Sequence, residues 1–144
     1  MKIIAIASPA GGVGKTTLAH AIAVAASEFG KQGQYRLGLE SRALDSDGMI
    51  EMLLGWIEKY PIVSIEDPLS EDDPEGFARF TKAIGHRLQI VGDDFLVSNS
   101  NLIREAANIG AANTVLLKPN QRGTLSETLQ AWKVAQELGY SAIV

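Results

Sequence analysis

A glycine-rich segment near the N-terminus has the composition of a loop that binds phosphate. It follows a short apolar run at residues 2–7, which predicts a buried strand, and precedes an Ala-, Leu- and Ile-rich run at 16–29, which predicts a helix. Glycines let backbone N–H groups close around phosphate oxygens, and the helix dipole adds to the attraction. In such a loop Lys15 would reach the β- and γ-phosphates of a nucleotide, and the Thr16 hydroxyl would ligate Mg²⁺. The predicted ligands of ATP or phosphate are Gly11, Gly12, Val13, Gly14, Lys15, Thr16 and Thr17.

This segment departs from the common phosphate-loop pattern at its first position. Pro9 stands where the pattern G-x-x-x-x-G-K-[ST] has its first glycine. Over residues 1–33 the sequence resembles the ParA/MinD class of partition and positioning ATPases, whose loop usually reads K-G-G-x-G-K-[ST]. Ala10 stands where that class has its signature lysine, which acts across a dimer. The resemblance implies nucleotide binding together with Mg²⁺.

A second group of polar residues stands at the ends of predicted strands. Glu66, Asp93 and Lys118 each follow a short apolar run, at intervals of about 25 residues. Strands alternate with helical patterns in this part of the sequence, which predicts βα units and a largely parallel sheet. Polar residues at the carboxyl ends of such strands are typical of both a (βα) barrel and an open sheet.

The segments around these residues resemble the barrel domain of enolases, over about residues 25–144. They read V-S-I-E-D-P at 63–68, I-V-G-D-D at 90–94 and L-L-K-P-N-Q at 116–121. In enolases the glutamate and the first aspartate of these motifs ligate the essential Mg²⁺, and the lysine removes the α-proton of 2-phosphoglycerate. The resemblance therefore assigns Mg²⁺ to Glu66 and Asp93, and the base to Lys118. Carboxylates suit a hard cation, and a neighbouring cation favours the neutral lysine that a base requires.

The sequence departs from the enolase pattern at a third metal ligand. Enolases carry a further carboxylate in a strand that reads roughly L-D-x-A-A-S-E-F, whereas residues 22–29 read I-A-V-A-A-S-E-F, with Ala23 at the aspartate position. The lid domain of the family and its S-x-R-S-G segment are also missing from the sequence. Because catalysis depends on the whole constellation of groups, we expect no enolase turnover.

The two resemblances meet within residues 21–33, where both patterns fit. We therefore expect an engineered or recombined chimera that folds as one α/β domain over residues 1–144. Its phosphate-loop segment would span 1–33 and its enolase-derived segment 34–144. In an open sheet, Glu66 or Asp67 would be an alternative acid for the loop, since phosphate-loop ATPases place an acid after a hydrophobic strand.

The elements that position these residues follow from periodicity and end signals. We expect strands at 35–39, 62–65, 88–91, 114–117 and 141–144. Helix starts are expected at Asp47, Asp73, Asn99 or Ser100, and Thr124. Parallel sheets are covered on both faces, so the favoured fold is an open three-layer α/β/α sheet of five or six parallel strands, as in Rossmann and phosphate-loop proteins. The alternative is a (βα) half-barrel that closes as a dimer.

Composition and charge narrow the class of protein. The chain has 144 residues, of which 46% are hydrophobic and 21% charged, so disorder is excluded. A net charge of −4 disfavours nucleic acid as a partner, and the lack of cysteine excludes thiolate sites. No apolar run is long enough to predict a membrane span. We expect a cytoplasmic monomer or homodimer whose ligand is a small-molecule nucleotide or phosphate.

Three functions compete at this point. The leading interpretation is a chimeric scaffold with residual phosphate or ATP binding at the loop and no enolase turnover. The second is nucleotide hydrolysis of the ParA kind, as a weak ATPase. The third is a degenerate enolase-like Mg²⁺ site at Glu66, Asp93 and Lys118. Binding that depends on Lys15 would favour the first, and activity that depends on Lys118 would favour the third.

Overall fold

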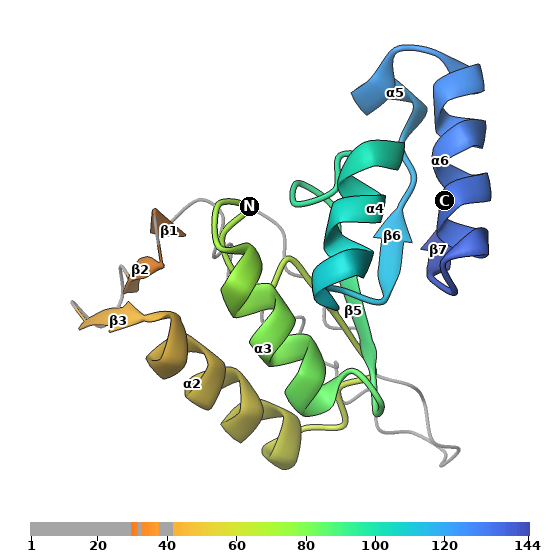
Figure 1. Cartoon of the computed structure of the whole chain (residues 1–144). Helices are drawn as coiled ribbons and strands as arrows, with labels where there is room; N and C mark the ends of the chain where they lie inside the picture. The colour runs from red at the N-terminus through yellow and green to blue at the C-terminus, as the bar shows by residue number, and fades with distance from the viewer. Residues whose placement is uncertain (1–29, 32, 38–41) are drawn as a thin grey trace, which may run out of the picture.

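The structure is a computed structural model that describes residues 30–31, 33–37 and 42–144. It contains one antiparallel and one parallel sheet, with helices packed on the latter (Figure 1). The antiparallel strands are β1 (Gly30–Lys31), β2 (Gln34–Leu37) and β3 (Arg42–Asp45). The parallel strands are β4 (Ser64–Glu66), β5 (Gln89–Gly92), β6 (Thr114–Leu116) and β7 (Ser141–Ile143). The helices are α2 (Ser46–Lys59), α3 (Pro74–Ile84), α4 (Ser100–Ile109), α5 (Pro119–Arg122) and α6 (Leu125–Glu137).

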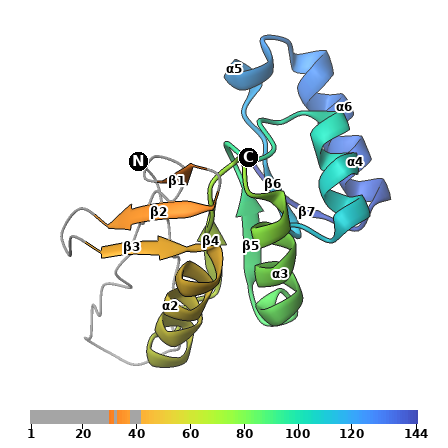
Figure 2. The same cartoon turned by 60° about the vertical axis from the view of Figure 1, so that its left-hand side comes forward.

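The parallel strands pair in chain order, β4-β5-β6-β7. Ile65 lies opposite Ile90, for example, and Val115 opposite Ala142. The long helices follow the same order, with α2 against α3, α3 against α4 and α4 against α6 (Figures 1 and 2). Consecutive strands beside a layer of consecutive helices are the arrangement of a (βα) barrel segment.

The predicted α/β class with a parallel sheet is confirmed. Four parallel strands lie within the described ranges, where five or six were expected, and the three short antiparallel strands form a sheet of their own. Sequence analysis found only the middle one of these three, at 35–39, because the other two are too short to show a period of two residues. The closing of a half-barrel as a dimer stays a prediction.

The starts of the helices are fixed by side-chain caps. The predicted caps Asp73, Asn99 and Thr124 are confirmed, each accepting a backbone N–H of the first turn. For α2 the predicted cap Asp47 is wrong. The helix begins earlier, and Asp45 Oδ1 accepts from Gly48 N at 2.8 Å, while Asp47 lies in the first turn, where its charge also stabilises the helix. Among the described helices, none has the length and apolar character that crossing a membrane requires.

The apolar core lies between the parallel sheet and the helix layer. Phe77 and Phe80 of α3 are fully buried, as is Ile90 of β5. Phe77 also stacks on Phe95, which lies just beyond β5, with 4.0 Å between the ring centroids. This packing fixes the segment that follows β5, and with it the carboxyl end of the sheet.

Candidate metal centre

Three strands bring Glu66, Asp93 and Lys118 together at the carboxyl end of the parallel sheet. Glu66 is the last residue of β4, Asp93 follows β5, and Lys118 lies beyond β6, where it precedes α5. The Lys118 ammonium donates to Asp93 Oδ2, and the carboxyl groups of Glu66 and Asp93 also interact. The residues that the enolase-like motifs single out therefore form one cluster.

A sharp turn after β5 folds the backbone over Asp93. The N–H groups of Leu96 and Val97 donate back to the Asp93 carbonyl oxygen at 3.2 and 2.7 Å. A Cβ atom at Gly92 would lie 2.5 Å from Leu96 Cγ, so the close approach of this turn to the strand requires glycine. The turn leaves the Asp93 residue 2% exposed.

The Asp93 carboxylate is held from both sides. Its Oδ2 atom accepts from the Lys118 ammonium, and its Oδ1 atom accepts from Gln121 Nε2 at 2.7 Å. The Lys118 side chain is 24% exposed, so it is only partly shielded from water. Each carboxylate oxygen has two lone pairs and retains capacity for a further ligand.

Glu66 differs from Asp93 because part of its carboxyl group lacks a partner. Glu66 is 6% exposed, and its Oε1 atom makes no hydrogen bond to any described residue. Burial, and then the neighbouring Asp93 carboxylate, raise the pKa of Glu66 to about 7, against the lowering effect of Lys118. A buried oxygen without a hydrogen bond is costly, so the Oε1 atom is a candidate ligand atom.

Asp67 is as buried as Glu66, and both oxygens of its carboxylate accept backbone N–H groups. Oδ1 accepts from Asp93 N at 3.0 Å and Oδ2 from Asp94 N at 2.9 Å. Burial raises the pKa of Asp67 to about 6, against the lowering effect of these two N–H groups. Asp67 therefore holds the backbone after β5, and each of its oxygens, like those of Asp93, keeps a lone pair for a further ligand.

The donor set at this end of the sheet fits a hard divalent cation. Carboxylate oxygens of Asp67, Asp93 and Asp94 lie within 4.8 Å of one another. Asp93 also lies beside Glu66, so the carboxylates near a cation at this position would be those of Glu66, Asp67, Asp93 and Asp94. Mg²⁺ is commonly bound by one or two carboxylates, with water completing its octahedral shell.

Two residues of this cluster were not predicted from the sequence. Gln121 belongs to the L-K-P-N-Q motif but was given no role, and Ser98 showed no signal at all. Ser98 enters the cluster through the turn between β5 and α4, which brings it against Lys118 and Gln121. Such a contact between loops has no local sequence signature.

The predicted phosphate loop, residues 11–17, lies outside the described residues, as does Ala23. Phosphate binding by Lys15, and the alternative use of Glu66 or Asp67 as an acid for that loop, stay predictions.

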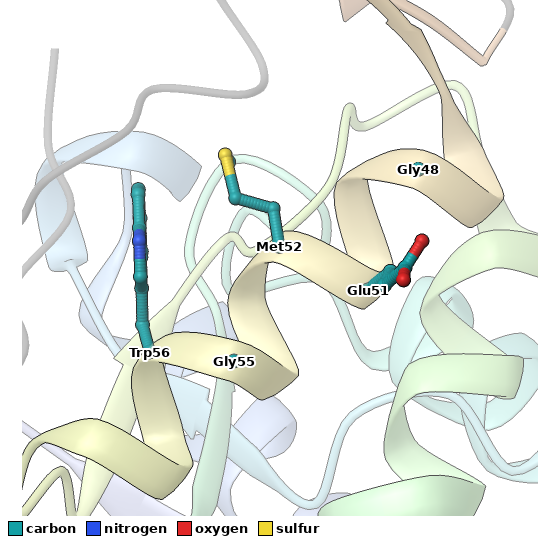
Figure 3. A pocket seen from close by; sticks show the side chains of 5 residues that line it. All are labelled: Gly48, Glu51, Met52, Gly55 and Trp56. Atoms are coloured by element: carbon teal, nitrogen blue, oxygen red, sulfur yellow. The ribbon is translucent and has the colours of Figure 1, made fainter.

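A separate hollow is formed by residues of α2. Gly48, Glu51, Met52, Gly55 and Trp56 line it. Figure 3 shows the Met52 and Trp56 side chains projecting from the helix into the space beside it. Glu51 is the sole ionisable group among the described residues that line it.

Comparison with known protein families agrees with this geometry. The sequence model of the enolase C-terminal TIM barrel domain matches residues 1–144. The match includes residues 1–33, the part that resembles phosphate-loop ATPases. It therefore supports the enolase resemblance and gives no support to a junction between two families.

Proposed function

Because the chain belongs to the family of the enolase C-terminal TIM barrel domain, we propose that the carboxyl end of its parallel sheet is a magnesium-dependent proton-transfer site. Glu66 and Asp93 would hold Mg²⁺, and Lys118 would move the proton α to the carboxylate of a substrate such as 2-phosphoglycerate. The observation that carries this proposal is the buried Oε1 atom of Glu66, which makes no hydrogen bond within the described part of the chain and lies in a carboxyl group beside Asp93.

Electrostatics support a cation at this position. Two buried carboxyl groups that interact directly repel each other when both are ionised, and the ammonium of Lys118 contacts Asp93. A divalent cation would supply the missing charge for Glu66. When bound, Mg²⁺ would act as a Lewis acid that stabilises negative charge developing on the substrate carboxylate.

Lys118 is placed to hold a proton beside the cation site. Its ammonium form donates to Asp93, and its neutral form has a lone pair that accepts a proton. Its side chain is partly exposed, in contrast to the buried Asp93 carboxylate. Asp93 thus orients the amine, and Lys118 carries the proton.

Calorimetric titration of the full chain with Mg²⁺ tests the cation site. Glu66→Ala and Asp93→Ala should each weaken binding about a hundredfold or more, since each removes a direct ligand. The matched control is Glu51→Ala, which removes an exposed carboxylate of α2 and should leave Mg²⁺ affinity unchanged. Equal affinity in all four proteins would contradict the proposal.

Exchange of the substrate α-proton tests the base. With 2-phosphoglycerate and Mg²⁺ in D₂O, proton NMR should show slow loss of the α-proton signal in the presence of the parent chain. Lys118→Ala should abolish this exchange, whereas Lys59→Ala, at the end of α2, should not change its rate. Exchange that persists in Lys118→Ala would exclude the proposed base.

A second candidate function, phosphate or ATP binding at residues 11–17, is favoured by the order of strand, glycine-rich segment and helix in the sequence. Thermal unfolding with and without Mg·ATP tests it. A stabilisation that disappears in Lys15→Ala would support this function, and no stabilisation of the parent chain would exclude it.

A further inference from the structure

We infer that Ser98 and Gln121 are positioning residues that fix Asp93 and Lys118 relative to each other. This inference rests on the proposed cation site, and it adds the polar groups that stand behind the ligand and the base. Neither residue is proposed to touch the cation or the substrate.

The directions of the hydrogen bonds follow from the chemistry of the groups. The backbone N–H of Lys118 can only donate, so Ser98 Oγ accepts from it, at 2.8 Å. The ionised Asp93 carboxylate can only accept, so the Gln121 amide presents its Nε2 atom to Asp93 at 2.7 Å. This orientation turns Gln121 Oε1 toward Ser98 Oγ, 2.9 Å away, as the nearer of two acceptors for the hydroxyl proton, the other being the Leu116 carbonyl oxygen at 3.2 Å.

These contacts close a ring around the base. The ring runs from the Lys118 backbone through Ser98 and Gln121 to Asp93, and returns to Lys118 through its side chain. Both ends of Lys118 are thereby tied to the same network. The ring assigns Asp93 Oδ1 to Gln121 and Oδ2 to Lys118, which fixes the rotation of the carboxylate that the proposed cation needs.

The backbone at Ser98 is strained in a way that fits this role. Val97 and Ser98 both have positive φ, of +39° and +52°, although neither is glycine. Such conformations cost free energy and persist when the surroundings require them. Here the turn carries the fully buried Ser98 hydroxyl to Lys118 and Gln121.

The opposite end of the sheet offers a matched hydroxyl. Thr81 Oγ1 accepts from the backbone N–H of Ala112 at 2.9 Å, and Ala112 also has positive φ, of +58°. Thr81 thus makes the same kind of bond to a strained backbone. Its partner Ala112 precedes β6, whereas Lys118, the partner of Ser98, follows β6. Loss of this hydroxyl serves as the control for purely structural effects.

The test is the affinity of the full chain for Mn²⁺, measured by electron paramagnetic resonance. Ser98→Ala and Gln121→Met remove the ring contacts without removing a ligand, and residues that orient metal ligands typically change affinity 10- to 100-fold. Both variants should bind Mn²⁺ at least tenfold more weakly than the parent. Ser98→Gly relieves the strained φ and also lacks the hydroxyl, so it should fold well and show the same loss. Thr81→Ala should keep the parent affinity.

Each result bears on the inference in a defined way. Mn²⁺ affinities of the Ser98 and Gln121 variants that equal that of the parent would overturn the inference and leave the cation site intact. A parent chain that binds no Mn²⁺ would overturn the proposed function, and the inference with it. A tenfold loss in Thr81→Ala as well would show that affinity follows stability and not the ring, which would also overturn the inference.

Discussion

The two ends of the parallel sheet use polar side chains in opposite ways. At the amino end, Asn113 Oδ1 accepts from Ile90 N at 2.8 Å, and its Nδ2 atom donates to the carbonyl oxygens of Gly85 and Leu88 at 3.0 Å. All of these groups are neutral, and every polar atom of the amide has a partner. At the carboxyl end, by contrast, the groups are charged and Glu66 Oε1 has no partner among the described residues.

This difference assigns stability to the amino end of the sheet and another use to its carboxyl end. A satisfied neutral network ties loops together and lowers the free energy of the folded state. Buried charges cost free energy, so their presence at the carboxyl end points to a use other than stability. Active sites of (βα) barrels lie at this same end.

The largest expected effect is on stability at the amino end. Asn113→Ala leaves the Ile90 N–H and two carbonyl groups without their partner, which should lower the free energy of unfolding by about 3 kcal/mol. Urea denaturation followed by circular dichroism measures this loss. A change below about 1 kcal/mol would show that the amino end is not the stabilising one.

At the carboxyl end of the sheet, a substitution should raise the free energy of unfolding and not lower it. The pKa of Glu66 rises from 4.5 to about 7, so the folded chain binds this proton more tightly than the unfolded chain. The resulting stability is fully present below about pH 4.5 and is lost as the pH rises through about 7. Glu66→Gln should remove most of this dependence and stabilise the metal-free chain at pH 8 by about 1 to 3 kcal/mol. Urea denaturation of both proteins at several pH values measures the effect, and a less stable variant at pH 8 would contradict it.

The loop after β4 is anchored by Tyr35 of β2, in the antiparallel sheet. The Tyr35 hydroxyl donates to Asp73 Oδ2 at 2.8 Å and accepts from Ser70 N at 3.2 Å, and Tyr35 is fully buried. Tyr35→Phe should therefore lower the free energy of unfolding by about 1.5 kcal/mol. Urea denaturation measures this loss. An unchanged free energy of unfolding would show that the Tyr35 hydroxyl does not anchor the loop.

The smallest effect should come from an ion pair at the surface. Arg104 Nη2 lies 3.7 Å from Glu137 Oε2 between α4 and α6, and both side chains are mostly exposed to water. Arg104→Ala should change the free energy of unfolding by less than about 0.5 kcal/mol. A larger loss in the same denaturation experiment would mean that charge at any position stabilises this protein. The difference between the two ends of the parallel sheet would then not hold.

The sequence predicted the regular part of the fold well. Alternation of apolar runs and capped helices located all four parallel strands and the starts of α3, α4 and α6, because these signals are local. It placed the start of α2 at Asp47, since Asp45 and Asp47 both suit a cap and only the course of the chain after β3 decides between them. The short strands at 30–31 and 42–45 carry no period and were missed.

The candidate site was predicted in its ligands but not in its supports. The motifs around Glu66, Asp93 and Lys118 named the charged groups, and the structure brings these groups together. The roles of Asp67 and Ser98 depend on hydrogen bonds between loops that are far apart in sequence, which no pattern within one segment can show. That Glu66 Oε1 has no partner among residues 30–31, 33–37 and 42–144 likewise becomes visible only when its neighbours are placed.

The buried charges at the carboxyl end of the parallel sheet are expected to lower the stability of the metal-free chain and to bind a cation. Thermal unfolding at pH 8, with and without saturating Mg²⁺, tests this expectation in the parent, Glu66→Gln and Asn113→Ala. A cation at a hundred times its Kd should add about 2.7 kcal/mol to the stability of the parent. We expect Asn113→Ala to start less stable and gain the same amount, and Glu66→Gln to start more stable and gain nothing. Equal gains in Glu66→Gln and the parent, or no gain in the parent, would contradict the account.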